Sequence, residues 1–287
     1  MRILKPLLLS LILAAPLPIT TVQAAPADVQ AAVAAPGRPA EATALDESRK
    51  PVEVLKFFGL EQGDRALDLF TGTAAPFTRV GYYAEIMGRA VGPKGAVVAW
   101  EPANLLDDAG KKNFTGLIAR VPNVHLISST AVDLTLDPAS FDFVLMHLVY
   151  HDTYWENEQF QFPRMDPDVF LAKIFAATKP GGIVGIVDHV AAPGGDTRAV
   201  VRNLHRIDPT KLRADFERAG FKLEAESNLL RNPPTIILSC RSIPRSAERL
   251  TASFTASANP GEGEQHRCRP HCSRLPWRPS PSARRSS

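Results

Sequence analysis

Residues 64–102 constrain the possible folds of this chain more than any other stretch. Two short apolar runs, 66–70 and 96–100, flank a segment in which apolar residues recur at helical spacing between residues 81 and 90. Thr71-Gly72-Thr73 interrupts the chain after the first run. The pattern predicts a strand, a glycine-containing loop, a helix and a second strand, which together form half of a mononucleotide-binding unit.

Three residues in this unit are candidates for binding a ligand. Gly72 lets the backbone approach a ligand closely, and a carboxylate at Glu101, where the second strand ends, accepts hydrogen bonds from ribose hydroxyls. Asp68 lies inside the first run, where it either contacts the ligand or organises the glycine loop. These residues are the candidates for binding a nucleoside-containing cofactor.

The alternation of strands and helices continues to residue 240. Further helices are expected over 45–60, 103–120, 165–178 and 208–219, and further strands over 124–128, 141–149, 183–187, 221–229 and 235–240. Because strands alternate with helices, the pattern predicts a three-layer, Rossmann-like α/β fold with a mainly parallel sheet. The last two strands flank Arg231–Pro234 and are expected to pair as a C-terminal antiparallel hairpin.

The chain from 47 to 232 resembles the class I S-adenosylmethionine-dependent methyltransferases. It is similar to a group of predicted methyltransferases whose first motif reads D-L-F-x-G-x-G-Y-Y. Here DLFTGT (68–73) and GYYAEIM (81–87) carry that motif, and AAPFTRV (74–80) separates its two halves. We interpret residues 74–80 as an insertion. The later stretches LVYHD (148–152) and VDHVA (187–191) also match the group.

This resemblance implies a methyltransferase that uses S-adenosylmethionine to methylate a small molecule. It implies that Asp68, Gly72 and Glu101 bind the cofactor, and that Gly81 is the third glycine of the motif if the insertion loops out. Asp133, in the loop after the third strand, would meet the adenine amine, as acids there do in the superfamily. The alternative is that Asp133 is a solvated loop acid.

Polar side chains follow the fourth and fifth predicted strands at the points where these strands end. Tyr150, His151 and Asp152 follow the fourth strand, and Asp188 and His189 end the fifth. Because parallel α/β folds bind ligands at the carboxyl ends of their strands, we expect both groups to face the crevice that holds Glu101.

These groups suggest roles in methyl transfer. His151 or His189 is expected to act as general base toward a hydroxyl, phenol or nitrogen of the acceptor, with a neighbouring carboxylate such as Asp152 orienting the ring. Tyr150 is expected to place its ring face against the sulfonium, and His205 to reach the rim of the pocket. The alternative for each histidine is a hydrogen-bonded structural residue.

We do not expect a metal site. The histidines and carboxylates at 151, 152, 188 and 189 lack a spacing such as H-E-x-x-H. The sequence HRCRPHC at 266–272 contains metal-ligating residue types, but its background is rich in arginine and proline. The domain before residue 240 contains no cysteine, so no disulfide framework is predicted within it.

The ends of the chain differ from the domain at 45–240. Residues 1–24 have the basic start, short apolar segment and small-residue end of a secretory signal, which predicts cleavage near Ala24, export to the periplasm or beyond, and no stable membrane insertion afterwards. An uncleaved anchor is the alternative. Residues 25–44 are interpreted as a flexible Ala/Pro spacer, and 241–287 as a disordered basic tail rich in Ser, Pro and Arg.

Two other functions remain open. The first is a non-catalytic relative that keeps the fold but has lost cofactor affinity through residues 74–80. The second is a nicotinamide-dependent Rossmann enzyme, which the missing G-x-G-x-x-G disfavours although Glu101 suits either cofactor. The net charge of +3 is small, so we expect no nucleic-acid partner, only a small-molecule acceptor.

Overall fold

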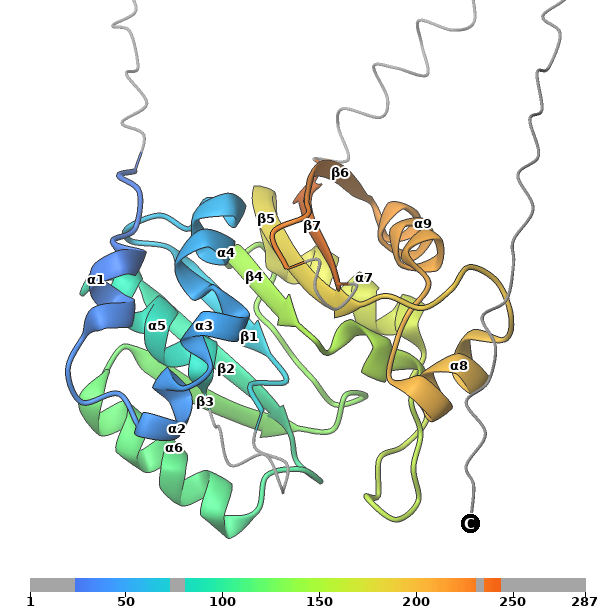
Figure 1. Cartoon of the computed structure of the whole chain (residues 1–287), viewed down its shortest axis with the longest axis horizontal. Coiled ribbons are helices and arrows are strands. Elements are labelled where there is room, and N and C mark those ends of the chain that lie inside the picture. Colours follow the sequence, from blue (N-terminus) through green and yellow to red (C-terminus); the bar gives the residue numbers. More distant parts are fainter. Residues whose placement is uncertain (1–23, 73–80, 231–234, 244–287) are drawn as a thin grey trace, which may run out of the picture. The chain divides into compact units, whose positions relative to one another are not determined.

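The computed structural model describes residues 24–72, 81–230 and 235–243. The strands are β1 (Arg65–Leu69), β2 (Ala96–Pro102), β3 (Val124–Ser129), β4 (Phe141–His147), β5 (Thr178–His189), β6 (Phe221–Ser227) and β7 (Thr235–Ser242). In this part of the chain they form one seven-stranded sheet with the order β3-β2-β1-β4-β5-β7-β6 (Figure 1). β1 to β5 are parallel, and β7 is antiparallel to β5 and β6. The predicted Rossmann-like α/β fold and its C-terminal antiparallel hairpin are confirmed.

The register of the central strands decides which side chains meet at the edge of the sheet. Leu69, the last residue of β1, pairs with Trp100 of β2 and with Met146 of β4. The residues that follow these positions therefore lie at one edge, the carboxyl ends of the parallel strands, where this class of sheet binds its ligands. Glu101 and His147 are the first of them.

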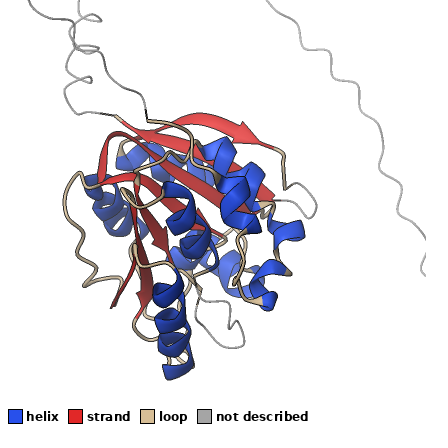
Figure 2. Ribbon diagram, turned by 90° about the vertical axis from the view of Figure 1, so that its left-hand side faces the viewer, coloured by secondary structure: helices blue, strands red, loops and turns tan. Residues whose placement is uncertain are grey.

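Helices cover both faces of the sheet. They are α1 (Val29–Ala34), α2 (Ala40–Thr43), α3 (Asp46–Arg49), α4 (Pro51–Phe58), α5 (Tyr82–Val91), α6 (Asp108–Arg120), α7 (Pro167–Ala177), α8 (Thr197–Leu204) and α9 (Pro209–Ala219), with a 3₁₀ helix, η1 (Tyr150–Tyr154). Figure 2 shows helices on the two sides of the sheet. Side chains from α1, α4, α5 and α6 form one apolar core with the sheet, and side chains from α7, α8, α9 and η1 form the other. Strands buried on both faces explain the continuous apolar runs of β1 and β4.

Residues 25–44 are not a flexible spacer, and this prediction was wrong. Val29 and Ala32 of α1 are buried against the core that contains α4 and α5. The Arg38 guanidinium, almost fully buried, donates to both carboxylate oxygens of Asp46, at 2.7 and 2.9 Å, and Tyr82 donates to the same carboxylate. An alanine-rich segment with few apolar residues can still pack against the domain when an ion pair and a hydrogen bond hold it there.

Two boundaries also differ from the predictions. The helix expected over 45–60 is broken at Lys50, whose φ of 45° ends α3, and α4 then starts at Pro51, a residue favoured at the first helical position. The domain extends to Ser242 rather than ending at 240. Arg241 pairs with Glu224 across the hairpin at 2.8 Å, and the Ser242 hydroxyl donates to the Lys179 carbonyl.

Several predictions concern residues outside the described part of the chain. These are the signal at 1–24, except its last residue, the insertion at 74–80, and the tail at 241–287, except its first three residues. Among the helices of the described residues, none is both long and apolar enough to cross a bilayer.

Candidate functional site

A cavity of about 640 Å³ lies at the carboxyl ends of the parallel strands. Its walls come from the ends of β1, β2, β4 and β5, together with η1 and the residues that follow α8. Most of the lining is apolar and aromatic, including Phe70, Trp155 and Phe162. Acidic residues lie in one part of the lining and histidines in another. A mostly apolar pocket with a few placed polar groups is typical of a small-molecule site.

The acidic part consists of Asp68 and Glu101, which are both buried and line the cavity. The Gly72 backbone N–H donates to the Glu101 carboxylate at 3.1 Å, and the Thr71 hydroxyl donates to Asp68 at 2.8 Å. Burial raises the pKa of Asp68 to about 7, and the nearby Glu101 adds to this rise, whereas the Thr71 hydrogen bond opposes it. The sequence analysis placed Asp68, Gly72 and Glu101 at one site, and in the structure all three line the cavity.

Arg49 is a residue of the cavity wall that the sequence analysis did not identify. It ends α3, and its guanidinium lies over the Tyr82 ring, 4.6 Å from the ring centroid. The Tyr83 hydroxyl donates to the Arg49 carbonyl at 3.5 Å. The helical pattern at 45–60 placed Arg49 on a helix but did not show that this helix faces the carboxyl ends of the strands.

His151 is held by Asp188 through two contacts. The Asp188 carboxylate accepts from the His151 backbone N–H at 2.9 Å, and its other oxygen lies 2.7 Å from Nδ1 of the imidazole. Burial alone would lower the pKa of His151, but the Asp188 and Asp152 carboxylates outweigh it and raise this pKa to about 9. The sequence analysis expected a neighbouring carboxylate to orient the ring; Asp188 of β5 is the residue that does so.

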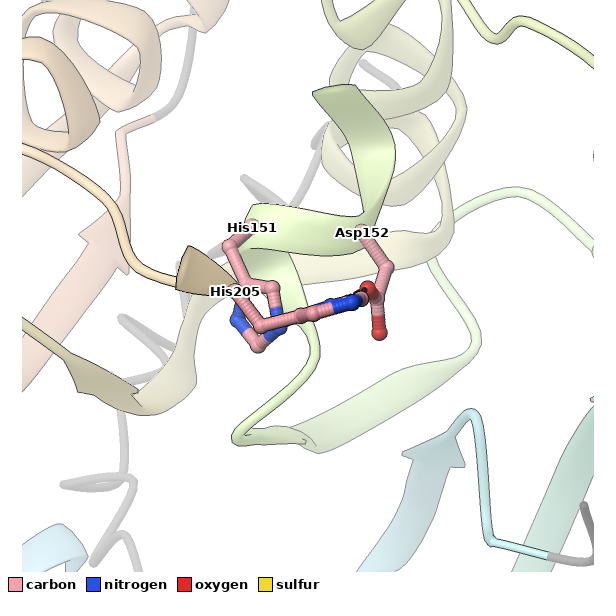
Figure 3. A group of neighbouring side chains, drawn as sticks. All are labelled: His151, Asp152 and His205. Atoms are coloured by element: carbon pink, nitrogen blue, oxygen red, sulfur yellow. Dashed lines mark ion pairs between the residues drawn. The ribbon is translucent and has the colours of Figure 1, made fainter. Parts of the chain in front are cut away.

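Asp152 lies between two imidazoles. Its Oδ1 is 3.4 Å from Nε2 of His151 and 3.5 Å from Nδ1 of His205 (Figure 3). His205 comes directly after α8, and its ring packs against Trp155 with the ring centroids 5.3 Å apart. The expected position of His205 at the pocket rim is supported, because its side chain is half-exposed and lines the cavity.

His189 also lines the cavity but is not part of this group. Its Nδ1 is buried and, among the described residues, has no hydrogen-bond partner. Burial lowers the pKa of His189; Asp188 opposes this effect, while His151 and Arg206 add to it. His189 is therefore a neutral imidazole at neutral pH.

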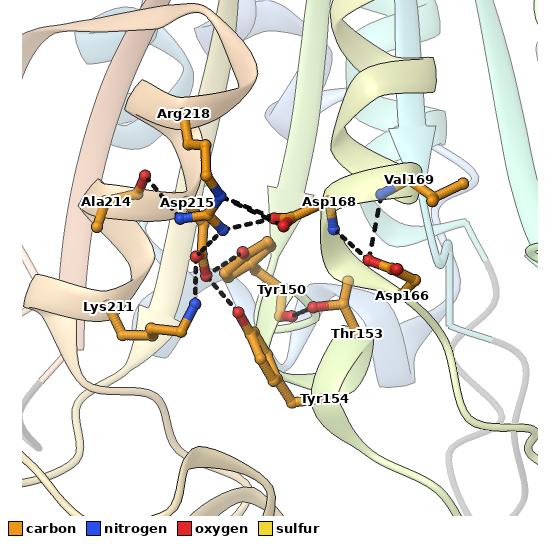
Figure 4. A network of polar contacts seen from close by, with 10 residues as sticks. All are labelled: Tyr150, Thr153, Tyr154, Asp166, Asp168, Val169, Lys211, Ala214, Asp215 and Arg218. Carbon is orange, nitrogen blue, oxygen red and sulfur yellow. Dashed lines mark hydrogen bonds and ion pairs between the residues drawn. The ribbon is translucent and has the colours of Figure 1, made fainter.

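Tyr150 does not line the cavity, so its ring is not placed to contact a sulfonium there. Its hydroxyl donates to the Asp215 carboxylate at 2.8 Å, inside the core (Figure 4). Tyr154 donates to the same oxygen at 2.5 Å, and Lys211 and Arg218 also contact Asp215. The tight turn of η1 directs Tyr150 toward α9 in the core and His151 toward the cavity, so the two adjacent residues have different surroundings.

Gly81 and Asp133 also lie away from the cavity lining. Gly81 has a φ of 67°, and a Cβ there would lie 2.4 Å from a methyl carbon of Leu117, so glycine is required for the backbone and for packing on α6. Asp133 is exposed and pairs with the Thr130 hydroxyl at 2.6 Å. The structure favours the solvated loop acid that the sequence analysis kept as an alternative.

The two ends of the segment between β1 and α5 lie close together. The Gly81 N–H donates to the Thr71 carbonyl at 3.0 Å. Removal of residues 74–80 would leave only Gly72 and Thr73 between these partners, and the same hydrogen bond would then close a β-turn. Gly72 already has a φ of 86°, which suits the first central position of such a turn.

We therefore expect a variant lacking residues 74–80 to fold and to bind S-adenosylmethionine about tenfold more tightly than the parent, a gain of about 1.4 kcal/mol. The shorter connection restores the D-L-F-x-G-x-G-Y-Y spacing of the resembled group's first motif and costs less closure entropy, roughly 0.6 kcal/mol per halving of its length. Calorimetric titration measures the affinity. A variant with seven Gly and Ser residues at 74–80 controls for length, and equal or weaker binding by the shortened chain would contradict the expectation.

The residues of the cavity suit S-adenosylmethionine. Two carboxylates at Asp68 and Glu101 match a ligand that carries ribose hydroxyls and a positive sulfur, and Arg49 matches its carboxylate. The volume of about 640 Å³ is within the range of about 300–1,000 Å³ that small-molecule and cofactor sites occupy.

Known proteins resemble this chain in sequence and in fold. Residues 79–186 match the family model described as a methyltransferase domain. No curated protein matches the chain. An S-adenosylmethionine-dependent methyltransferase from Aquifex aeolicus superposes with a TM-score of 0.53 at 20% identity, over 70% of this chain and 93% of that one. A second such enzyme, from Mesorhizobium loti, gives 0.48 at 18% identity, over 69% and 99% of the two chains. At 20% identity, the likeness to the Aquifex protein concerns the fold alone.

Proposed function

We propose that this chain is a class I methyltransferase that uses S-adenosylmethionine as methyl donor and methylates the hydroxyl group of a small, largely apolar molecule. The observation that carries the proposal is the division of one cavity into an acidic part and an imidazole part. The acidic part suits the donor. The imidazole part suits an acceptor that must lose a proton.

The lining indicates the class of acceptor. Between the two polar parts the wall is aromatic and apolar, with Trp155, Phe160 and Phe162 beside the histidines. Aromatic walls favour a planar or apolar body, and the imidazoles and the Asp152 carboxylate favour a polar atom on it. A phenol or a comparable small alcohol combines both properties.

Among the histidines, we assign the general base to His189. Both ring nitrogens of His151 already lie beside carboxylates, Nδ1 at 2.7 Å from Asp188 and Nε2 at 3.4 Å from Asp152. His189 lines the cavity and is a neutral imidazole at neutral pH. Neutral imidazole next to the acceptor is the form that general-base catalysis requires.

In the proposed reaction, S-adenosylmethionine supplies a methyl group bound to a positive sulfur, which becomes a neutral thioether when the methyl leaves. The acceptor oxygen forms the new carbon–oxygen bond with its own electron pair, and Nε2 of His189 takes the proton from that oxygen. Glu101 and Asp68 hold the donor end in place, so that the methyl faces the acceptor. Bond formation, bond cleavage and proton transfer balance without a further reactant.

Substitution of His189 by asparagine is expected to lower kcat by about 10²- to 10⁴-fold, the usual contribution of a general base. The assay transfers labelled methyl from S-adenosylmethionine to a panel of small phenols and alcohols. His125→Asn is the matched control, because His125 is exposed on β3 and lies outside the cavity lining. Undiminished turnover in His189→Asn would contradict the assigned role, and a panel that stays unlabelled while the donor binds would contradict the acceptor class.

A further inference from the structure

We propose that His151, Asp152 and His205 form a site for a divalent transition-metal cation, for which Zn²⁺ is the best match, in the wall of the cavity. The ligand atoms are Nε2 of His151, Oδ1 of Asp152 and Nδ1 of His205. This inference deepens the proposed function, on which its role in methyl transfer rests, since the cation would hold the acceptor oxygen. The binding of the cation itself is independent of that role.

The proposed ligand atoms are separated by distances that suit a tetrahedral zinc site. Zinc bonds to nitrogen and oxygen are about 2.0–2.2 Å, so neighbouring ligand atoms of a tetrahedral site are separated by about 3.3–3.5 Å. Asp152 Oδ1 lies 3.4 Å from one imidazole nitrogen and 3.5 Å from the other. The third pair, between the two nitrogens, is within 4.8 Å.

The same distances are poor for direct hydrogen bonds. Charge-assisted N–H···O bonds are about 2.7–2.9 Å long. The pair that His151 makes with Asp188 has this length, 2.7 Å, whereas both contacts of Asp152 are longer by more than half an ångström. The carboxylate of Asp152 thus lies at the separation that two ligands of one ion adopt.

The second, independent observation is the support behind His151. Metal-binding histidines commonly donate their other ring N–H to a carboxylate, which fixes the tautomer and aims the free nitrogen. Asp188 does this for Nδ1 of His151 and is fully buried. It also accepts from the His151 backbone N–H at 2.9 Å, so ring and backbone are held together. Nε2 is the nitrogen left for a ligand role.

His205 is also held in place by its backbone. It follows α8 in a left-handed conformation, with φ 46° and ψ 54°, which is uncommon for a residue other than glycine and costs energy. Its N–H donates to the Val201 carbonyl at 2.9 Å. Its ring lies against Trp155 on one side and approaches His151 edge-on, with ring centroids 5.5 Å apart. A strained backbone that turns an imidazole toward two other ligand types is consistent with a binding role.

Two imidazoles and one carboxylate leave a zinc ion one open position. All three residues line the cavity, so an acceptor hydroxyl is the natural fourth ligand. A cation there lowers the pKa of a bound hydroxyl and makes proton transfer to His189 easier. His189 and Asp188, which the sequence grouped with His151 and Asp152, are not ligands in this arrangement.

Zinc binding to the full-length chain tests the inference. Cys268 and Cys272 are replaced by serine in all proteins, so that HRCRPHC does not compete for the ion. After treatment with a chelator, Zn²⁺ is titrated in competition with a chromophoric chelator. We expect one equivalent to bind, with affinity reduced more than about a hundredfold in His205→Ala and in Asp152→Asn. Asp188→Asn is expected to weaken it by about 10- to 100-fold, the usual effect of a supporting carboxylate. The exposed His125→Ala is the control and should bind as the parent does.

Equal zinc affinity in the parent, His205→Ala and Asp152→Asn would overturn the inference, as would the absence of binding by the parent. His205 is exposed, so its substitution leaves the core intact. Parallel titrations with S-adenosylmethionine separate this failure from that of the proposed function. Donor binding and methyl transfer that persist in excess chelator would overturn only the role of the cation in methyl transfer. Zinc binding that depends on the three residues, in a chain that binds no donor, would support the cation site and overturn the proposed function.

Discussion

Replacement of Glu101 by alanine is expected to weaken the binding of S-adenosylmethionine at least about thirtyfold. Glu101 is buried at the end of β2 and lines the cavity, and its carboxylate suits the two hydroxyls of a ribose. Hydrogen bonds to a charged group contribute about 1.5–3 kcal/mol each, and a loss of about 2 kcal/mol corresponds to about thirtyfold in affinity. Calorimetric titration of the full-length variant measures the effect.

Asp133→Ala is the matched control for this experiment. Asp133 is another acid to which the sequence analysis gave a cofactor contact, and the structure places it in an exposed loop outside the cavity lining. Its substitution should leave the affinity within about twofold of the parent, as is usual for a surface change of less than about 0.5 kcal/mol. A large loss in Asp133→Ala, or unchanged affinity in Glu101→Ala, would mean that the donor binds elsewhere.

The second large effect concerns stability. Asp215→Ala is expected to lower the free energy of unfolding by about 3–5 kcal/mol, the usual cost of removing one partner of a buried charged network. The Asp215 carboxylate is fully buried and accepts from Tyr150, Tyr154, Lys211 and Arg218 (Figure 4). Without it the hydroxyl of Tyr150, itself buried, loses its acceptor.

Urea denaturation at neutral pH measures this loss. The control is Asp168→Ala, which removes the exposed partner of the same Arg218 and should cost less than about 1 kcal/mol, as surface ion pairs do. If both variants lost the same small amount, the network around Asp215 would contribute no more than a surface ion pair. Because η1 carries Tyr150 and Tyr154 next to His151, this network also supports the imidazole part of the cavity.

The same carboxylate makes stability depend on pH. Burial alone would raise the pKa of Asp215, but its hydrogen bonds with Lys211, Tyr154, Arg218 and Tyr150 outweigh burial and lower this pKa below its ordinary value of 3.8. A carboxyl with a lowered pKa stabilises the fold at pH values above about 4, and this contribution is lost as the pH falls toward the folded-state pKa. The parent should therefore lose more stability than Asp215→Ala on acidification below pH 4, as measured by thermal unfolding. Parallel curves would contradict the assignment.

Periodicity and strand ends were sufficient to predict much of this molecule. The short apolar runs of β1, β2, β4 and β5 are continuous because both faces of these strands are buried, and this made the parallel sheet visible in the sequence. The ends of these predicted parallel strands placed Glu101, His151 and His189 at one edge of the sheet, where the carboxyl ends of the strands meet. These inferences depend only on local pattern and on the common direction of parallel strands.

The features that the sequence analysis missed depend on contacts between residues that are distant in the sequence. α8 was not predicted, and without it the position of His205 next to Asp152 could not be inferred. Arg38 and Asp46 pair across a segment whose alanine content suggested flexibility. Tyr150 was expected in the cavity because it follows the fourth strand, but the turn of η1 and the acceptor on α9 direct it into the core. Local pattern shows neither a turn of this kind nor the distant residue that completes its hydrogen bond.

The most direct test of the central claim is calorimetric titration of S-adenosylmethionine into the full-length parent chain and into the variant lacking residues 74–80. A donor site at the carboxyl ends of the strands predicts saturable binding of one equivalent, tighter in the shortened chain than in the parent. Binding by the shortened chain alone would mean that residues 74–80 disable an otherwise intact site. The absence of saturable binding by both folded proteins would contradict the claim that this cavity holds the methyl donor.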